Sequence, residues 1–159
     1  MRTAFLLSAL LAVPGTSLAQ TAPTNPLASD VERLSAEINP QVVAWRRDFH
    51  EHPELGNRET RTSKIIADEL KKLGYEVTTN IATTGVVGVL KGGRPGPVVA
   101  LRSDMDALPV TEQVDLPFKS IAKTEWNGQQ VGVMHACGHD QHMAILLGTA
   151  TTLARMKDR

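Results

Sequence analysis

The sequence predicts an α/β fold, in which part of an open sheet is covered by helices. One segment carries apolar residues at helical spacing, and short β-branched runs separated by turn residues follow it. A further helical segment lies near the end of the chain, so the strands fall between helices. The chain has 159 residues, of which 42% are hydrophobic. That length is sufficient for about one domain.

The first 19 residues are typical of a secretory signal peptide. Arg2 supplies the positive start, residues 4–13 are apolar, and Ala19 ends a small-residue cleavage site. The apolar run is shorter than the ~20 residues that span a bilayer, so we expect no stable membrane anchor once the peptide is cleaved. An uncleaved anchor is the alternative. We expect cleavage after Ala19, a flexible tail over residues 20–28 and a periplasmic or secreted protein.

Two helices are predicted in the first half of the chain. Asn39-Pro40 favours a helix start, since Asn caps a helix and Pro loses no N–H bond at the first position. That helix should reach about His52. A second helix is predicted from Thr60 to Leu73, with these apolar residues at helical spacing: Ile65, Ile66, Leu70 and Leu73. Gly74 fits the left-handed position just beyond its end.

Strands are predicted at Tyr75–Thr79, Val86–Leu90 and Val98–Leu101, because each is a short apolar or β-branched run. Segment 91–97, rich in Gly and Pro, is expected to turn. A final helix is predicted over Asp140–Met156. Three of its residues are expected to face the core: Ile145, Leu146 and Leu153.

The charge and the cysteine content limit which partners and which kinds of site the chain is expected to have. The chain has 17 basic and 17 acidic residues, so its formal net charge is zero and nothing in it favours a nucleic-acid partner. Cys137 is the only cysteine and cannot form an intrachain disulfide. In an oxidising compartment a lone thiol is exposed to oxidation unless it is buried or metal-bound, which favours a ligand role.

The run from His135 to Asp140 (His-Ala-Cys-Gly-His-Asp) is the most informative feature. Thiolate, imidazole and carboxylate groups bind borderline-soft divalent metals. Alternate residues of an extended segment point the same way, so His135, Cys137 and His139 could share a face. We predict Cys137 and His139 as metal ligands. A thiol enzyme, with Cys137 as nucleophile and His135 or His139 as base, is a second interpretation.

Asp104-Met105-Asp106 follows the predicted strand Val98–Leu101. Ligands gather beyond the carboxyl ends of strands in open α/β sheets, so these two carboxylates are placed to meet a metal. An ordinary polar loop, in which each Asp caps a turn, is the alternative. Taken without other context, the two residues favour that loop.

Three segments together resemble peptidase family M20, most closely its amidohydrolase branch of hippurate hydrolases, N-acyl-amino-acid amidohydrolases and plant auxin-conjugate hydrolases. In the family's order they are Arg46–Leu55, Leu101–Pro109 and His135–Asp140, with His142 two residues beyond the last. The resemblance covers roughly residues 43–155. It implies that residues 29–159 are the N-terminal part of a zinc-peptidase-like catalytic domain.

The resemblance also implies roles for individual residues. Cys137 and His139 would bind metal, and Asp106, the candidate catalytic residue, would orient a ligand without binding the metal itself. Asp104 stands where related peptidases have a histidine and is a weaker candidate. His135 and His142 are weaker candidates too, expected to support the site.

Three further residues of these motifs are expected to have structural roles. His50 and His52 should pack or cap at the end of the first helix, and Arg102 should pair with local carboxylates.

By resemblance, the function is an exported hydrolase with two divalent ions (Zn, Mn, Co or Ni) that cleaves N-acyl amino acids, short peptides or related amides. A homo-oligomer is compatible with the full-length form. Family members supply a Glu-Glu pair, which contains the general base, and further histidine ligands later in the chain. No Glu-Glu pair follows residue 139 and no histidine follows His142, so the general base is unknown. We expect this chain alone to be inactive. A non-catalytic remnant or binding module is the alternative.

Overall fold

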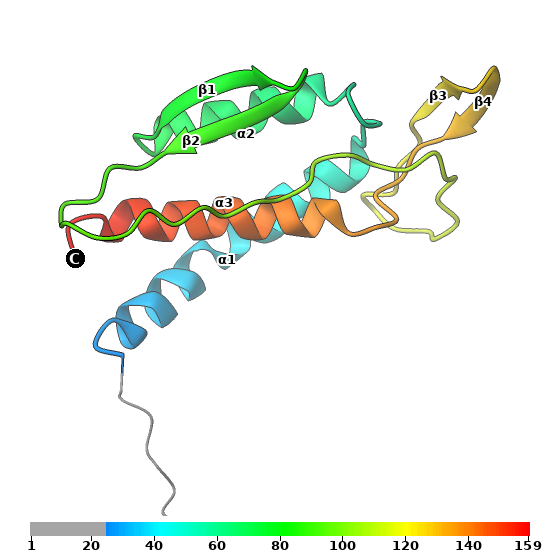
Figure 1. Cartoon of the computed structure of the whole chain (residues 1–159). Helices are drawn as coiled ribbons and strands as arrows, with labels where there is room; N and C mark the ends of the chain where they lie inside the picture. Colours follow the sequence, from blue (N-terminus) through cyan, green and yellow to red (C-terminus); the bar gives the residue numbers. More distant parts are fainter. Residues whose placement is uncertain (1–24) are drawn as a thin grey trace, which may run out of the picture.

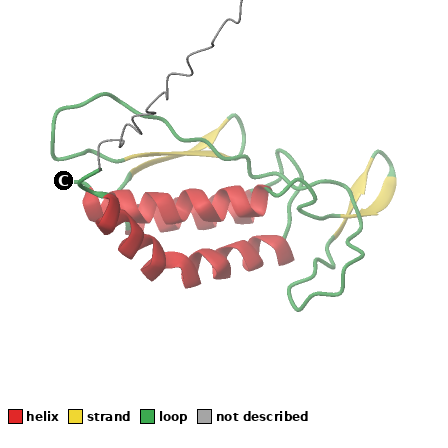
Figure 2. Cartoon of the chain, turned by 90° about the horizontal axis from the view of Figure 1, so that it is seen from below, coloured by secondary structure: helices red, strands yellow, loops and turns green. Residues whose placement is uncertain are grey.

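The computed structural model describes residues 25–159, so the expected signal peptide and residues 20–24 of the expected tail lie outside the described residues. The elements of the described chain are α1 (Ala28–Glu51), α2 (Thr60–Lys72), β1 (Glu76–Ile81), β2 (Gly85–Val89), β3 (Lys123–Trp126), β4 (Gln129–Gly132) and α3 (His139–Met156) (Figure 1). Helices and strands mix along the chain, and the predicted α/β class is confirmed. Within residues 25–159 the strands form two separate antiparallel hairpins, β1–β2 and β3–β4 (Figure 2).

Helix α1 begins at Ala28, so the predicted start at Asn39-Pro40 is wrong. The start lies instead just after Asn25, the first residue of another Asn-Pro pair. The Asn25 side-chain oxygen accepts a hydrogen bond from the Leu27 N–H, and its backbone oxygen accepts one from Ala28, both at 3.0 Å. Pro40 lies inside the helix, where it removes one backbone bond. Packing of α1 along α3 outweighs that local cost (Figure 1).

The prediction for α2 and the hairpin behind it is confirmed to within two residues at each boundary. Gly74 has φ +85°, the left-handed conformation expected beyond a helix end. The β1–β2 hairpin packs on α2. Tyr75, just before β1, donates its hydroxyl to the Ala150 backbone oxygen of α3 at 2.9 Å. These contacts join the hairpin and α2 to α3.

The predicted strand at Val98–Leu101 is wrong. Val98 is 99% exposed, and no residue of this segment pairs with another strand in the described part of the chain. An apolar run becomes a strand only when a neighbouring backbone supplies partners. Pairing begins later, where Ala107 bridges Leu55 in parallel and Leu108 bridges Met134 in antiparallel.

The buried face predicted for α3 is also wrong, although the helix itself lies where expected. Ile145 is 59% exposed and Leu153 is 46% exposed. The residues that α3 buries are Asp140, Met143, Ala144, Leu147, Gly148, Ala150 and Thr151. Apolar residues occupy much of the helix circumference, so the sequence alone did not single out one face. The core that results joins Phe49 of α1 to Met143 and Leu147 of α3.

The β3–β4 hairpin was not predicted. Its turn is Asn127-Gly128, with φ 51° and φ 76° respectively. Asn-Gly between two short strands is the usual signature of such a turn, so the signal was in the sequence. Among residues 25–159, no helix combines the length and the apolar character that crossing a membrane requires.

Candidate metal centre

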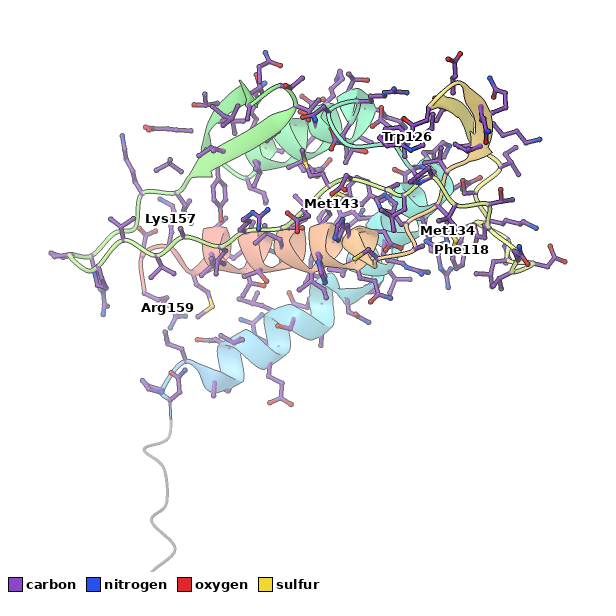
Figure 3. The ribbon with its side chains drawn as sticks, turned by 45° about the vertical axis from the view of Figure 1, so that its right-hand side comes forward. Phe118, Trp126, Met134, Met143, Lys157 and Arg159 are labelled. Carbon is purple, nitrogen blue, oxygen red and sulfur yellow. The ribbon has the colours of Figure 1, made fainter. Side chains whose placement is uncertain are left out.

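Two of the three sequence motifs meet at the start of α3. The backbone bridge between Leu108 and Met134 places the aspartate segment beside the His-Ala-Cys-Gly-His-Asp run. Met134 and Phe118 lie at the end of the molecule where α3 begins (Figure 3). Gly138 has φ +82°, a conformation that few residues other than glycine adopt, and α3 begins at the next residue, His139.

His139 is held by Asp106. Its Nδ1 lies 2.8 Å from the Asp106 backbone oxygen and 3.1 Å from the carboxylate Oδ1. Both partners only accept hydrogen bonds, so Nδ1 carries the proton and donates. The other ring nitrogen, Nε2, lies 3.9 Å from Asp104 Oδ2, beyond hydrogen-bond distance. A histidine fixed at one nitrogen by an acidic residue, with the other nitrogen free, is the usual arrangement of a metal ligand.

The other candidate residues differ in exposure and in partners. Cys137 is exposed as a free thiol. The Arg102 guanidinium pairs with the Asp104 carboxylate, as expected of a local partner. The ring of His142 lies 5.6 Å from that of His139, centroid to centroid.

His135 does not share a face with Cys137, contrary to expectation, because the chain turns directly after it. His135 is 4% exposed, and neither ring nitrogen has a hydrogen-bond partner among the described residues. Burial lowers the pKa of His135 to about 4, against a partial opposing effect of Asp140, so the imidazole is neutral at neutral pH.

These donors fit part of a metal site. A thiol and a free imidazole nitrogen are suited to a borderline-soft divalent ion. Within residues 25–159, however, no group of three or more His, Cys, Asp or Glu side chains is arranged to hold a metal. The described residues therefore provide only some of the ligands that a metal ion needs. The roles of Cys137 and His139 as ligands stay predictions.

The first motif, Arg46–Leu55, supports this region from the end of α1 and the turn that follows it. Glu54 accepts hydrogen bonds from the backbone N–H groups of Arg61 and Thr62, at 3.0 and 2.8 Å, and so caps α2. Its backbone oxygen accepts one from Ala107, at 2.8 Å, next to Asp106. At the end of α1, His52 Nδ1 lies 2.9 Å from the Asp48 backbone oxygen, a capping contact of the kind expected.

A buried cluster behind the site was missed by sequence reasoning. His50 lies between two carboxylates: Nδ1 is 2.8 Å from Asp140 Oδ2 and Nε2 is 3.0 Å from Glu112 Oε1. Arg46 Nε also lies 2.9 Å from Asp140 Oδ2, as an ion pair. Burial alone raises the pKa of Glu112, but hydrogen bonds from His50 and the Ser120 N–H outweigh it and hold that pKa below its usual value. No sequence pattern pointed to Glu112.

Comparison with known proteins agrees with the resemblance in the motifs. Residues 100–159 match the model of peptidase family M20/M25/M40. A thermostable carboxypeptidase of Saccharolobus solfataricus is 51% identical over 80% of this chain and 32% of its own length. An N-acyl-L-amino acid amidohydrolase of Geobacillus stearothermophilus is 41% identical over 81% of this chain and 33% of its own length.

A solved structure is similar as well. A Bacillus subtilis protein, described as a dinuclear metal binding peptidase from the M20 family, superimposes with a TM-score of 0.65 at 39% identity. The match covers 79% of this chain and 32% of that protein. This chain thus spans about a third of the length of the curated relatives it matches. With three motifs in the family's order, a family match and a matching solved structure, the chain belongs to peptidase family M20 as a partial chain.

Proposed function

We propose that this chain is part of an exported, metal-dependent amide hydrolase that acts on N-acyl amino acids or short peptides. The observation that carries the proposal is the His139 ring, fixed at Nδ1 by Asp106 and free at Nε2 beside Asp104. The names of the relatives support an amide or peptide substrate. The apolar leader that ends at Ala19 supports export.

In this proposal Cys137 and His139 hold part of a two-ion centre, of Zn, Mn, Co or Ni, and later segments supply the other ligands. Bound divalent ions polarise a carbonyl and lower the pKa of water. Asp106 keeps the His139 proton on Nδ1, and so keeps Nε2 available. No residue of the described chain is assigned as the general base.

The test uses the natural full-length protein, purified from its source, with N-acetyl and N-benzoyl amino acids as substrates. We expect hydrolysis that a chelator abolishes and added Mn²⁺ or Zn²⁺ restores, and its loss in Cys137→Ala and in His139→Ala. Near-normal turnover in Cys137→Ala would overturn that ligand role. Metal-independent turnover, or none with any substrate, would favour the non-catalytic module.

Export is tested by the mass of the same protein. A mature form that starts at Gln20 is expected, recovered from the periplasm or the medium. Retention of residues 1–19 would contradict cleavage.

A further inference from the structure

Four ionisable side chains that the proposed function does not use meet behind the candidate metal centre. Arg46 and His50 come from α1, Glu112 from the loop before β3, and Asp140 from the first turn of α3. The Asp140 and Glu112 side chains are each 1% exposed, and that of His50 is 4% exposed. Charges buried this deeply cost free energy unless each is paired, so their pairing must be specific.

The ring of His50 bridges the two carboxylates, with Nδ1 at Asp140 and Nε2 at Glu112, and Arg46 adds an ion pair to Asp140. A carboxylate oxygen only accepts hydrogen bonds, so Nδ1 donates to Asp140. The second oxygen of Glu112 accepts from the Ser120 N–H at 2.6 Å. The Phe118 ring covers the cluster, with its centroid 5.7 Å from that of His50 and 5.1 Å from the Arg46 guanidinium.

The start of α3 depends on this cluster. Gly138 precedes the helix and, having no side chain, provides no cap for its free N–H groups. Asp140 lies in the first turn, but its carboxylate accepts from His50 instead of capping its own helix. The first turn is therefore fixed to α1, and this turn carries His139.

We propose that His50 is a positioning residue of the metal centre: by donating to Asp140 it fixes the first turn of α3, and with it the direction in which His139 presents Nε2. Asp106 holds the ring of His139, and the His50–Asp140 contact holds its backbone. The inference rests on the proposed function, since it needs His139 to be a ligand.

Two substitutions separate this role from simple packing. In His50→Asn the amide nitrogen replaces Nδ1 and keeps the bond to Asp140, whereas in His50→Gln it replaces Nε2 and keeps only the bond to Glu112. His52→Gln, at the exposed end of the same helix, is the control. Affinity for Zn²⁺ alone is measured by calorimetry on the metal-free natural full-length protein, together with kcat and KM.

We expect Zn²⁺ affinity to fall about 10-fold in His50→Gln and to stay within about 3-fold of wild type in His50→Asn, with kcat following affinity. A packing role predicts the opposite order, because Gln is closer to His in volume. Wild-type affinity in His50→Gln, or an equal loss in both variants, would overturn the proposal. If His50→Gln does not fold, Asp140→Ala, which removes the acceptor of the Nδ1 bond, must show weaker Zn²⁺ binding, and unchanged binding there overturns the proposal. A wild type that binds no Zn²⁺ counts against the proposed function instead.

Discussion

At the scale of single residues, His139 is the best-defined group of the candidate centre. One ring nitrogen donates to Asp106 and the other faces Asp104. The sequence motif predicted that Asp106 would orient a ligand, because the two residues occupy matching places in family M20. What the sequence could not predict is that Asp106 uses its backbone oxygen as well as its carboxylate. The residue type does not predict such a main-chain contact, because every residue has a backbone oxygen.

Asp106→Asn tests the carboxylate. We expect Zn²⁺ affinity of the full-length protein to fall about 10-fold, near the lower end for such partners, because the backbone oxygen still fixes the ring. Calorimetry measures this, with Asp115→Asn on an exposed loop as control. Equal affinities of the two variants would rule out an orienting carboxylate.

Alkylation distinguishes a metal ligand from a nucleophile at Cys137. In the full-length protein saturated with Zn²⁺, we expect iodoacetamide to label Cys137 slowly, and a chelator to speed the labelling, because a bound ion shields a thiolate. Peptide mass spectrometry follows the modification. Fast labelling with the metal bound would favour the thiol enzyme.

His135 makes stability depend on pH. In the metal-free protein its pKa is about 4 when folded, below the usual value near 6.5, so the unfolded state binds the extra proton. Stability should therefore fall as pH drops from about 6.5 towards 4, by up to about 3 kcal/mol. Urea unfolding at several pH values should show a smaller fall in His135→Phe than in wild type. His142→Gln, at an exposed site, should match wild type.

At the scale of elements, local signals predicted local structure. Helix α2 and the β1–β2 hairpin carry their own caps, turns and periodicity, and both lie where expected. The start of α1 was missed because the helix continues through Pro40, at a local cost that packing along α3 outweighs and that no local window contains. The face of α3 was missed for the same reason: Ala144, Gly148 and Ala150 are small residues that let another element approach closely.

Gly148 of α3 is one position at which α1 approaches closely. A Cβ added there would lie 2.6 Å from Val42 Cγ2 on α1. Alanine favours a helix over glycine by about 1 kcal/mol, yet we expect Gly148→Ala to lower the free energy of unfolding by roughly 1–2 kcal/mol through overpacking. Urea denaturation measures the change. The double variant with Val42→Ala should recover most of the loss, and a stabilised Gly148→Ala would show that the helices separate freely.

At the scale of the whole molecule, the described chain leaves apolar surface uncovered. Val98, Val99 and Leu101 form an extended segment that is exposed along with Ile121. The sequence predicted a strand at the first three, and their composition is that of a buried strand. The prediction failed because the described residues provide no neighbouring strand, which is a property of the whole sheet and not of the segment.

This surface should make residues 25–159 bind hydrophobic dye and self-associate when produced alone. We expect Val98→Lys together with Val99→Lys to reduce both effects, as measured by dye fluorescence and sedimentation. Lys substitutions at Ile145 and Leu153 test whether any exposed apolar pair on another element has the same effect. If all four substitutions act equally, the extended segment has no special part in association.

The hydrogen bonds that Glu54 accepts at its side chain and at its backbone oxygen limit where residues can be inserted into this chain. Its side chain caps α2 while its backbone is tied to Ala107, so the residues between Glu54 and Thr60 must bridge a fixed gap. An inserted residue there would break either the cap on α2 or the hydrogen bond to Ala107. Loss of the second contact would release Ala107, the neighbour of Asp106. Segment 91–97 is tied to another element by one backbone hydrogen bond, from the Gly93 N–H to the Lys157 oxygen, so insertions should be accepted more readily there than at residues 55–59.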